Sequence, residues 1–246
     1  MRSLISATIA VLLLSGPPPR RASGQEKSVN PGINKPFENP DVAEFIKRFE
    51  TNSREVYAQR VAIVDALGLR PGQAVADLGA GTGVFTGLIA DKVGPRGKVY
   101  AVDIAKPFLD HVAAEAKKRG QTQVQTVRCP PDGTGLQPQS IDLAFICDVY
   151  HHLEFPAKSL ASVHQALRQG GELVVVDFDR REGVSSAFVL EHIRASKDVF
   201  IKEIEAAGFE RIATAKAPVL KETFFVRFRK HEPPTAPPST PPKDPT

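Results

Sequence analysis

Three glycines at alternate positions follow a short apolar run and an acid in the stretch Val75-Ala76-Asp77-Leu78-Gly79-Ala80-Gly81-Thr82-Gly83. Because glycine has no Cβ, the backbone of such a turn can approach a bound ligand closely. Twenty residues after Gly83, the run from Val99 to Asp103 predicts a second strand that ends in an acid. An acid at that position can bind the hydroxyl groups of a ribose in nucleotide-binding folds. The spacing therefore predicts a site for a ligand that contains a nucleoside.

The sequence of residues 77–83, together with Asp103, resembles the S-adenosylmethionine (SAM) site of class I methyltransferases. Residues from about 54 to 228 can be aligned with the order of elements in that family. A nicotinamide-dependent dehydrogenase is the alternative, but its fingerprint is G-x-G-x-x-G. Here Val84 stands three residues after Gly81, so the third glycine comes one place too early for that fingerprint. A tight turn that binds no nucleotide is the remaining alternative.

The resemblance implies that the glycine turn meets the methionine part of SAM, with Asp77 near its ammonium group. Asp103 would accept charge-assisted hydrogen bonds from the ribose hydroxyls, with an exposed turn acid as the alternative. Counting back from Leu136 places Asp132 at the acid that binds the adenine amine in that family, with a solvated loop acid as the alternative. Asp148, after the fourth strand, would lie close to the cofactor. The residues predicted to bind SAM are Asp77, Gly79, Ala80, Gly81, Gly83, Asp103, Ile104, Asp132, Gly133 and Asp148.

The run Tyr150-His151-His152 follows the fourth predicted strand and resembles the segment that opens into the acceptor pocket of small-metabolite methyltransferases. Histidine can take a proton near neutral pH, so one imidazole could deprotonate a hydroxyl or phenol of the acceptor. The predicted catalytic residues are Tyr150, His151 and His152, and a histidine that only bonds a backbone carbonyl is the alternative. Two adjacent histidines are not expected to point the same way. No third ligand occurs at a useful spacing, so no metal site is predicted.

Other polar residues around the predicted site have two interpretations. Asp177, Asp179 and Arg180 follow the fifth strand and are predicted to form a salt-bridged surface. Residues on the N-terminal helices could cover the site as a lid, with a solvated helix face as the alternative; these are Glu50, Arg54, Tyr57 and Arg60.

The charge of the chain does not indicate a nucleic-acid partner. The formal net charge is +4, but Arg2, Arg20 and Arg21 lie in the N-terminal leader, and without them the charge is +1. The chain without its leader therefore lacks the overall positive charge with which proteins bind phosphate backbones. The Asn/Asp-Pro-Pro-Tyr motif of enzymes that methylate amino groups of nucleic acids is also missing. We therefore expect a small-molecule acceptor; an exported SAM-binding module without catalysis and a protein or RNA methyltransferase remain alternatives.

Strands and helices alternate after the first glycine turn, which predicts a parallel sheet covered on both faces. The resemblance implies a Rossmann-like, doubly wound, mostly parallel seven-stranded sheet with an antiparallel last strand. A helical cap over residues 39–68 precedes it, with Asn39 and Ser53 as predicted N-caps. The predicted strands are 75–78, 98–103, 123–128, 141–147, 172–178, 210–217 and 223–229, and the helices between them are 84–90, 107–118, 156–168 and 184–207, the last one broken near Ser196.

The 246 residues and 41% hydrophobic content fit one α/β domain with extensions. Residues 1–24 are predicted to be a signal peptide, since Arg2 precedes a short apolar run that is followed by prolines and small residues. Export to the periplasm or medium is therefore expected, with no stable membrane span after cleavage; an uncleaved interfacial anchor is the alternative. The remaining predicted parts are an extended lead-in over 25–38, a methyltransferase domain over 39–231 and a proline-rich tail over 232–246 that cannot form a core.

Cys129 and Cys147 are the two cysteines of the chain. The implied strand order places them at the ends of the third and fourth strands, three strand spacings apart. That separation is about 14 Å, roughly twice the distance that a disulfide can bridge between two Cα atoms. No disulfide is expected between them, even in an oxidising compartment.

Overall fold

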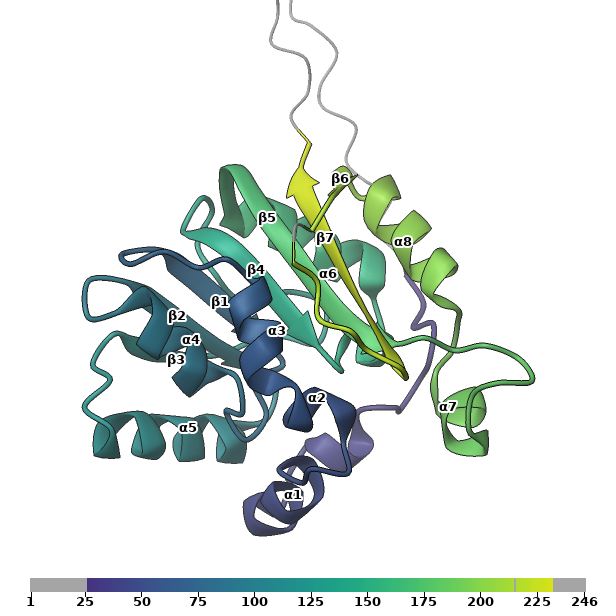
Figure 1. Ribbon diagram of the computed structural model, residues 1–246, viewed down its shortest axis with the longest axis horizontal. Coiled ribbons are helices and arrows are strands. Elements are labelled where there is room, and N and C mark those ends of the chain that lie inside the picture. Colours follow the sequence, from purple (N-terminus) through teal and green to yellow (C-terminus); the bar gives the residue numbers. More distant parts are fainter. Residues whose placement is uncertain (1–25, 215, 232–246) are drawn as a thin grey trace, which may run out of the picture.

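A seven-stranded sheet with helices on both faces forms the body of the computed structural model, which describes residues 26–214 and 216–231 (Figure 1). The strand order is β3-β2-β1-β4-β5-β7-β6. Neighbouring strands run parallel from β3 to β5, whereas β7 pairs antiparallel with both β5 and β6. The predicted Rossmann-like sheet is confirmed, including its antiparallel last strand.

The strands agree with the predicted ranges to within one residue at each end, except for β5 and β6. Their bounds are β1 Ala74–Leu78, β2 Lys98–Asp103, β3 Val124–Arg128, β4 Ile141–Cys147, β5 Leu167–Phe178, β6 Phe209–Ile212 and β7 Thr223–Lys230. β5 begins five residues before the predicted start because Leu167 already pairs with Ile141 across a register shift. β6 is shorter than predicted, since its pairing with β7 ends at Ile212.

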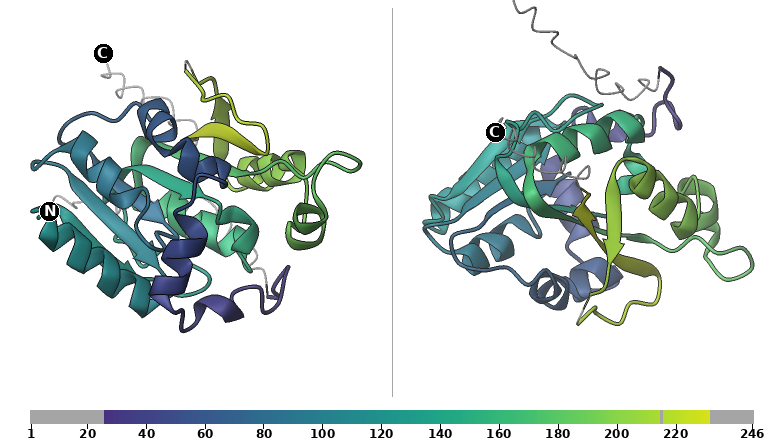
Figure 2. Two further views of the ribbon diagram at one scale, coloured as in Figure 1. Left: turned by 60° about the horizontal axis from the view of Figure 1, so that its bottom comes forward. Right: turned by 90° about the horizontal axis from the view of Figure 1, so that it is seen from above.

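The parallel strands are buried on both faces, which explains their nearly continuous apolar sequences. On one face, Val75, Val99 and Phe145 pack with residues of α3 Arg60–Ala66 and α4 Thr86–Val93. On the other face, Ala76 and Ile146 pack with residues of α6 Pro156–Ala166 and α8 Lys197–Ala206. α5 Lys106–Lys118 covers β2 through Val112 (Figure 2).

The short elements that precede the sheet lie beyond the carboxyl ends of the parallel strands (Figure 1). They are η1 Lys35–Phe37, a 3-10 helix, followed by α1 Val42–Phe49 and α2 Glu55–Ala58. The predicted caps Asn39 and Ser53 are wrong. Asp41 caps α1 instead, because its backbone is extended and its carboxylate accepts hydrogen bonds from the N–H groups of Ala43 and Glu44. No side chain caps α2, and Gln59 separates it from α3.

The sequence predicted an extended lead-in over residues 25–38, but the structure shows that it is not extended throughout. Residues Lys35–Phe37 turn into η1, and the ring of Phe37 packs 5.3 Å from Phe45 and 5.0 Å from His152. The side-chain amide of Asn34 donates a hydrogen bond to the backbone carbonyl of His152. These contacts fold the segment back over the loop that follows β4.

The predicted signal peptide and proline-rich tail lie outside the described residues. Within residues 26–214 and 216–231, no helix is both long and apolar enough to cross a bilayer. Cys129 and Cys147 are both free thiols, and two strands separate β3 from β4, which is the separation that the predicted strand order implied. Burial raises the pKa of Cys129 to about 12 and that of Cys147 well above its usual range, so neither thiol is a ready nucleophile.

Candidate active site

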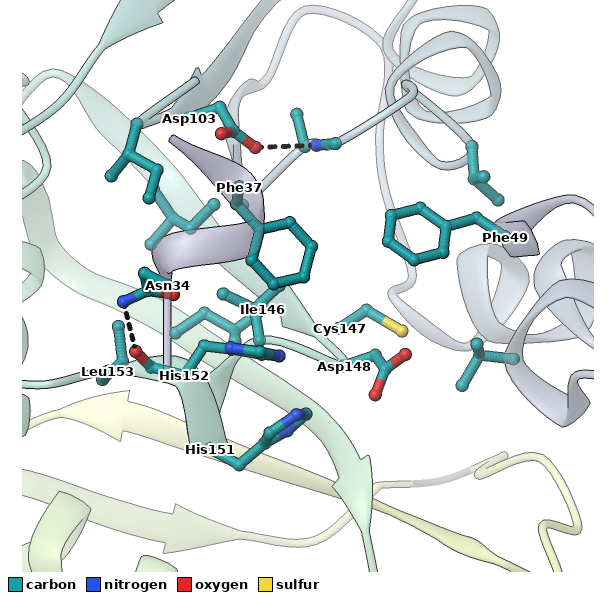
Figure 3. A pocket seen from close by; sticks show the side chains of 18 of the residues that line it. Asn34, Phe37, Phe49, Asp103, Ile146, Cys147, Asp148, His151, His152 and Leu153 are labelled. Atoms are coloured by element: carbon teal, nitrogen blue, oxygen red, sulfur yellow. Dashed lines mark hydrogen bonds between the residues drawn. The ribbon is translucent and has the colours of Figure 1, made fainter. Parts of the chain in front are cut away.

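A pocket of about 540 Å³ opens at the carboxyl ends of β1, β2 and β4 (Figure 3). The strand order reverses between β1 and β4, which are neighbours in the sheet. In open α/β sheets, ligands bind past the carboxyl ends of the strands at such a switch point. η1, α1 and α2 provide part of its wall, and α7 Ala187–His192 provides another part. The pocket therefore lies between the sheet and segments that precede β1 and follow β5 in the chain.

The glycine turn forms the wall of the pocket at the end of β1. Gly79, Gly81 and Gly83 all have positive φ angles, of 75°, 52° and 85°. A Cβ at Gly79 would lie 2.5 Å from the side chain of Val149, so this glycine is needed for packing. A Cβ at Gly81 would lie 3.7 Å from the ring of Phe49 and 4.0 Å from the carbonyl oxygen of Gly79, both ordinary contacts. Gly79, Ala80 and Gly81 line the pocket, whereas Gly83 packs against Val112 of α5.

Asp103 ends β2 and lines the pocket beside Ile104, with only 7% of its surface exposed. Its two carboxylate oxygens accept hydrogen bonds from the backbone N–H groups of Gly81 and Ala105, each at 2.9 Å. Burial raises the pKa of Asp103, and these two bonds oppose that effect. Each oxygen keeps a further lone pair, so the carboxylate can still accept from a pair of ligand hydroxyls.

Asp77 lies beneath the glycine turn and does not line the pocket. It is 3% exposed, and the hydroxyl of Thr86 in α4 donates to its carboxylate at 2.6 Å. Burial, followed by the nearby charge of Asp103, raises the pKa of Asp77 to about 7. The hydroxyl of Thr82, in the same turn and on the pocket wall, is buried without a hydrogen-bond partner among the described residues. The turn therefore contains a buried polar atom that no described residue satisfies.

The loop after β3 contributes Gly133 and Thr134 to the pocket, but not Asp132. The carboxylate of Asp132 pairs with Lys158 of α6 at 3.3 Å. The N–H and hydroxyl of Thr134 both bond the hydroxyl of Ser162, which fixes the loop against α6. The structure thus brings one of the two residues predicted for the adenine to the pocket.

Asp148 follows β4 with a positive φ of 57°, an unusual conformation for a residue other than glycine. Its carboxylate forms an ion pair with Arg54, which precedes α2 and stacks its guanidinium 4.8 Å from the ring of Phe49. Burial lowers the pKa of Arg54. The N-terminal helices are thereby tied to the end of β4 directly over the pocket, and Arg54 is the lid candidate that makes this contact.

Tyr150 is not at the pocket, in contrast to its prediction as a catalytic residue. Its side chain is fully buried against Phe200, and its hydroxyl donates to Glu203 at 3.0 Å. Burial and the charge of Glu203 raise the pKa of Tyr150. The residue therefore belongs to the core between η2 Tyr150–His152 and α8.

His151 and His152 both line the pocket, and their rings lie 4.2 Å apart (Figure 3). The expectation that they point in different directions is wrong. They lie in the 3-10 helix η2, in which successive side chains turn by about 120° instead of alternating as in a strand. Neighbouring rings can therefore meet on one side of the chain.

Asp177 orients His151. The Nδ1 atom of His151 lies 2.8 Å from one carboxylate oxygen, and the backbone N–H of His151 donates to the other. Asp177 is fully buried, so the predicted salt-bridged surface is wrong for this residue. No sequence pattern indicates this pair, because the two residues follow different strands, β4 and β5. A buried carboxylate behind an imidazole fixes the tautomer and leaves Nε2 available on the other side of the ring.

His192, at the end of α7, is a third imidazole that the sequence did not reveal. Its ring lies 5.1 Å from that of His151 and 5.2 Å from that of His152, and it stacks on Phe188. The expectation that no third ligand lies near the pair is therefore wrong. Burial, reinforced by the charges of His151 and His192, lowers the pKa of His152 to about 2. Burial also lowers the pKa of His192, so both rings are neutral at physiological pH.

Comparison with known proteins agrees with this arrangement. Residues 76–173, which run from β1 into β5, match the model of a family described as "Methyltransferase domain". A crystal structure of a SAM-dependent methyltransferase from Aquifex aeolicus superposes with a TM-score of 0.63 at 21% identity, over 78% of this chain and 99% of that one. At this identity the likeness shows the fold alone.

Two curated proteins are similar over the central part of the chain. An uncharacterized 37.1 kDa transposon protein of Streptomyces fradiae is 29% identical over 142 residues, 57% of this chain and 40% of that protein. The ubiquinone/menaquinone biosynthesis C-methyltransferase UbiE of Vibrio vulnificus is 30% identical over 118 residues, 48% of this chain and 45% of that protein. The chain thus spans less than half the length of these relatives.

Proposed function

Because the chain carries a class I SAM-dependent methyltransferase domain, we propose that it transfers the methyl group of SAM to a small molecule bound beside His151 and His152. SAM supplies an electrophilic methyl group on a sulfonium. The observation that carries the proposal is the convergence of the glycine turn, the buried Asp103 and the paired imidazoles on one pocket.

The residues at the β1 and β2 ends fit the cofactor. Asp103 is held by two backbone N–H groups and keeps lone pairs for the ribose hydroxyls. Gly81 has no side chain, so the turn adds no bulk to the pocket wall at that position. Asp148, beyond β4, lines the pocket as an ion pair with Arg54.

The residues at the β4 and β5 ends fit an acceptor. The imidazoles of His151 and His152 can hydrogen-bond the nucleophilic group of the acceptor. The Nε2 atom of His151, whose ring Asp177 keeps in place, can help to remove its proton. Methyl transfer needs mainly that the nucleophile lies close to the methyl carbon and opposite the sulfur. The ring of Phe37 and the contact of Asn34 with His152 close this part of the pocket, which favours a small acceptor over a polymer.

Two measurements on the purified chain test the proposal. Calorimetry is expected to show one SAM bound per chain, and incubation with methyl-labelled SAM and a small-molecule extract is expected to move the label into a product below the size of a peptide. A chain that binds no SAM would refute the assignment. Binding without transfer to any extract fraction would favour a binding module, and label in protein or RNA would redirect the acceptor assignment.

A further inference from the structure

Three imidazoles from two distant segments meet at the acceptor side of the pocket. We propose that His151, His152 and His192 bind one divalent transition-metal ion of the zinc class. One ring nitrogen of each residue lies within 4.8 Å of one ring nitrogen of the other two. Imidazole nitrogen is a preferred ligand for zinc and for the neighbouring divalent ions of the first transition row.

The ring positions fit a common ion. Three imidazoles bound to one tetrahedral ion, with metal–nitrogen distances of about 2.0–2.1 Å, place their ring centroids about 5 Å apart. The observed separations are 5.1 Å and 5.2 Å from His192 to the other two rings, and 4.2 Å between His151 and His152. Small rotations of the side chains would therefore bring the three nitrogens to a single ion.

The surroundings of the rings provide a second, independent observation. The Nδ1 atom of His152 is buried and has no hydrogen-bond partner among the described residues. A buried polar atom without a partner is costly, and a metal ion that it binds would remove that cost. His151 shows the complementary feature, since its Nδ1 atom already bonds Asp177 and its Nε2 atom remains for an ion. A carboxylate behind a ligating histidine is the usual outer support of metal sites in proteins.

The local charge also suits a cation. Asp148 and Asp177 each place a carboxylate oxygen within 4.8 Å of a nitrogen of His151. Arg54 balances Asp148, so the carboxylate of Asp177 is left to offset the charge of a bound ion. Phe37 and Phe188 pack against His152 and His192 and hold the two rings from outside the cluster.

Three protein ligands leave one tetrahedral position open, and all three histidines line the pocket. This step of the inference rests on the proposed function: the open position would take an acceptor that binds through a hydroxyl, phenol or thiol. A bound ion lowers the pKa of such a group, so its proton is released to water on binding. The acceptor oxygen or sulfur then forms a bond to the methyl carbon as the carbon–sulfonium bond breaks, which leaves a neutral thioether and a methylated acceptor. The rings would thus act through the ion, not as bases.

The test titrates the full chain, stripped with a chelator and dialysed, with Co²⁺ followed by visible absorption and with Zn²⁺ followed by calorimetry. One ion per chain and a tetrahedral cobalt spectrum are expected. His192→Ala is the test variant because His192 is half-buried on a short helix at the rim of the pocket. It is expected to weaken binding by more than about 100-fold, since even the outer supports of metal ligands contribute 10–100-fold.

The matched control is His164→Ala, which removes another half-buried histidine that packs on Phe209 away from the pocket. Its metal affinity should equal that of the wild type. The metal site would be overturned if the wild type bound neither ion. It would also be overturned if His192→Ala had the metal affinity of the wild type, or if both variants lost the same amount of metal affinity. SAM affinity of the stripped wild type is measured in parallel, so a failure of the proposed function shows as absent SAM binding and is distinct from a failure of the metal titration.

Discussion

Asp103 combines two tasks in one carboxylate, because it fixes the glycine turn through Gly81 and faces the pocket. Asp103→Asn keeps one acceptor oxygen but removes the charge and turns the other position into a donor. We expect it to weaken SAM binding by about 1.5–3 kcal/mol, the usual contribution of a hydrogen bond to a charged group. Calorimetry measures the effect, with the exposed Asp110→Asn on α5 as control. Equal SAM affinity in both variants would remove Asp103 from the ribose site.

Asp77 should make the stability of the ligand-free protein depend on pH. Its pKa is about 7 in the folded protein, against 3.8 for an ordinary aspartate. Below about pH 4 the carboxyl is protonated in both the folded and the unfolded chain. As the pH rises towards 7, the unfolded chain releases this proton while the folded protein keeps it. The free energy of unfolding therefore falls over this range, by up to about 4 kcal/mol. Asp77→Asn cannot ionise and should lose less stability over this range.

Urea unfolding of the wild type and of Asp77→Asn at pH 4, 5.5 and 7 measures this difference. Asp65→Asn serves as control, since Asp65 is half-exposed and pairs with Lys92 on the surface. Parallel stability curves for wild type and Asp77→Asn would mean that Asp77 is ionised in the folded protein and that burial does not govern its titration.

Local sequence predicted part of each side of the pocket: Gly79, Gly81 and Asp103 on the cofactor side, and the adjacent His151 and His152 on the acceptor side. Gly79, Gly81 and Asp103 stand within two strand–turn units, so spacing alone places them together. His192 and Asp177 reach His151 only through the fold, and no period in the sequence connects them. The prediction for Tyr150 was wrong because a 3-10 helix, which short polar runs do not reveal, rotated its side chain into the core.

At the scale of an element, the glycine turn is the part whose shape should decide cofactor binding. Gly81→Ala adds a methyl group between the turn and the ring of Phe49, where the pocket lies. We expect a loss of SAM affinity of at least about 10-fold, together with about 1–2 kcal/mol of stability because the positive φ strains an alanine. Gly120→Ala is the matched control, since Gly120 has a φ of 66° and nothing within 4 Å of its added Cβ.

Calorimetry with SAM and thermal unfolding of both variants separate the two effects. Similar losses of stability with a loss of binding only in Gly81→Ala are expected. Unchanged binding in Gly81→Ala would mean that the cofactor does not approach the turn at this glycine.

Elements inside the sheet were easier to predict than those around it. The bounds of β2 and β4 equal the predicted ranges, because each is a largely apolar run with an acid at its end: Asp103 is the last residue of β2, and Asp148 directly follows β4. The N-terminal cap was predicted less well: Asn39 precedes a proline and looks like a helix start, yet Asp41 is the residue whose carboxylate reaches the first free N–H groups. Short helices that are stabilised mainly by contacts with the pocket wall carry little signal of their own.

At the scale of the whole molecule, the strand order followed from the alternation of strands and helices together with the family resemblance. Alternation predicts parallel strands with crossovers, but it does not by itself order β5, β7 and β6 at the sheet edge. The antiparallel insertion of β7 between β5 and β6 depends on the long pairing of β7 with β5, from Glu172 with Arg229 to Phe178 with Thr223. The resemblance supplied that part of the prediction, and residue patterns did not.

The segment before the domain should be part of the site. Ser28, Val29 and Asn34 donate hydrogen bonds to Glu154 or His152, and Phe37 packs on His152. We propose that export removes residues 1–24, which would leave these contacts intact; the mature protein should begin near Gln25 by mass spectrometry.

A chain that begins at residue 39 should still fold and bind SAM at the β1 and β2 ends. Hydrogen exchange at residues 150–154 should then be faster than in a chain that begins at residue 25, because the lead-in no longer covers them. Equal exchange in the two chains would show that the lead-in does not hold the acceptor side of the pocket, and a mature protein that retains Met1 would contradict cleavage.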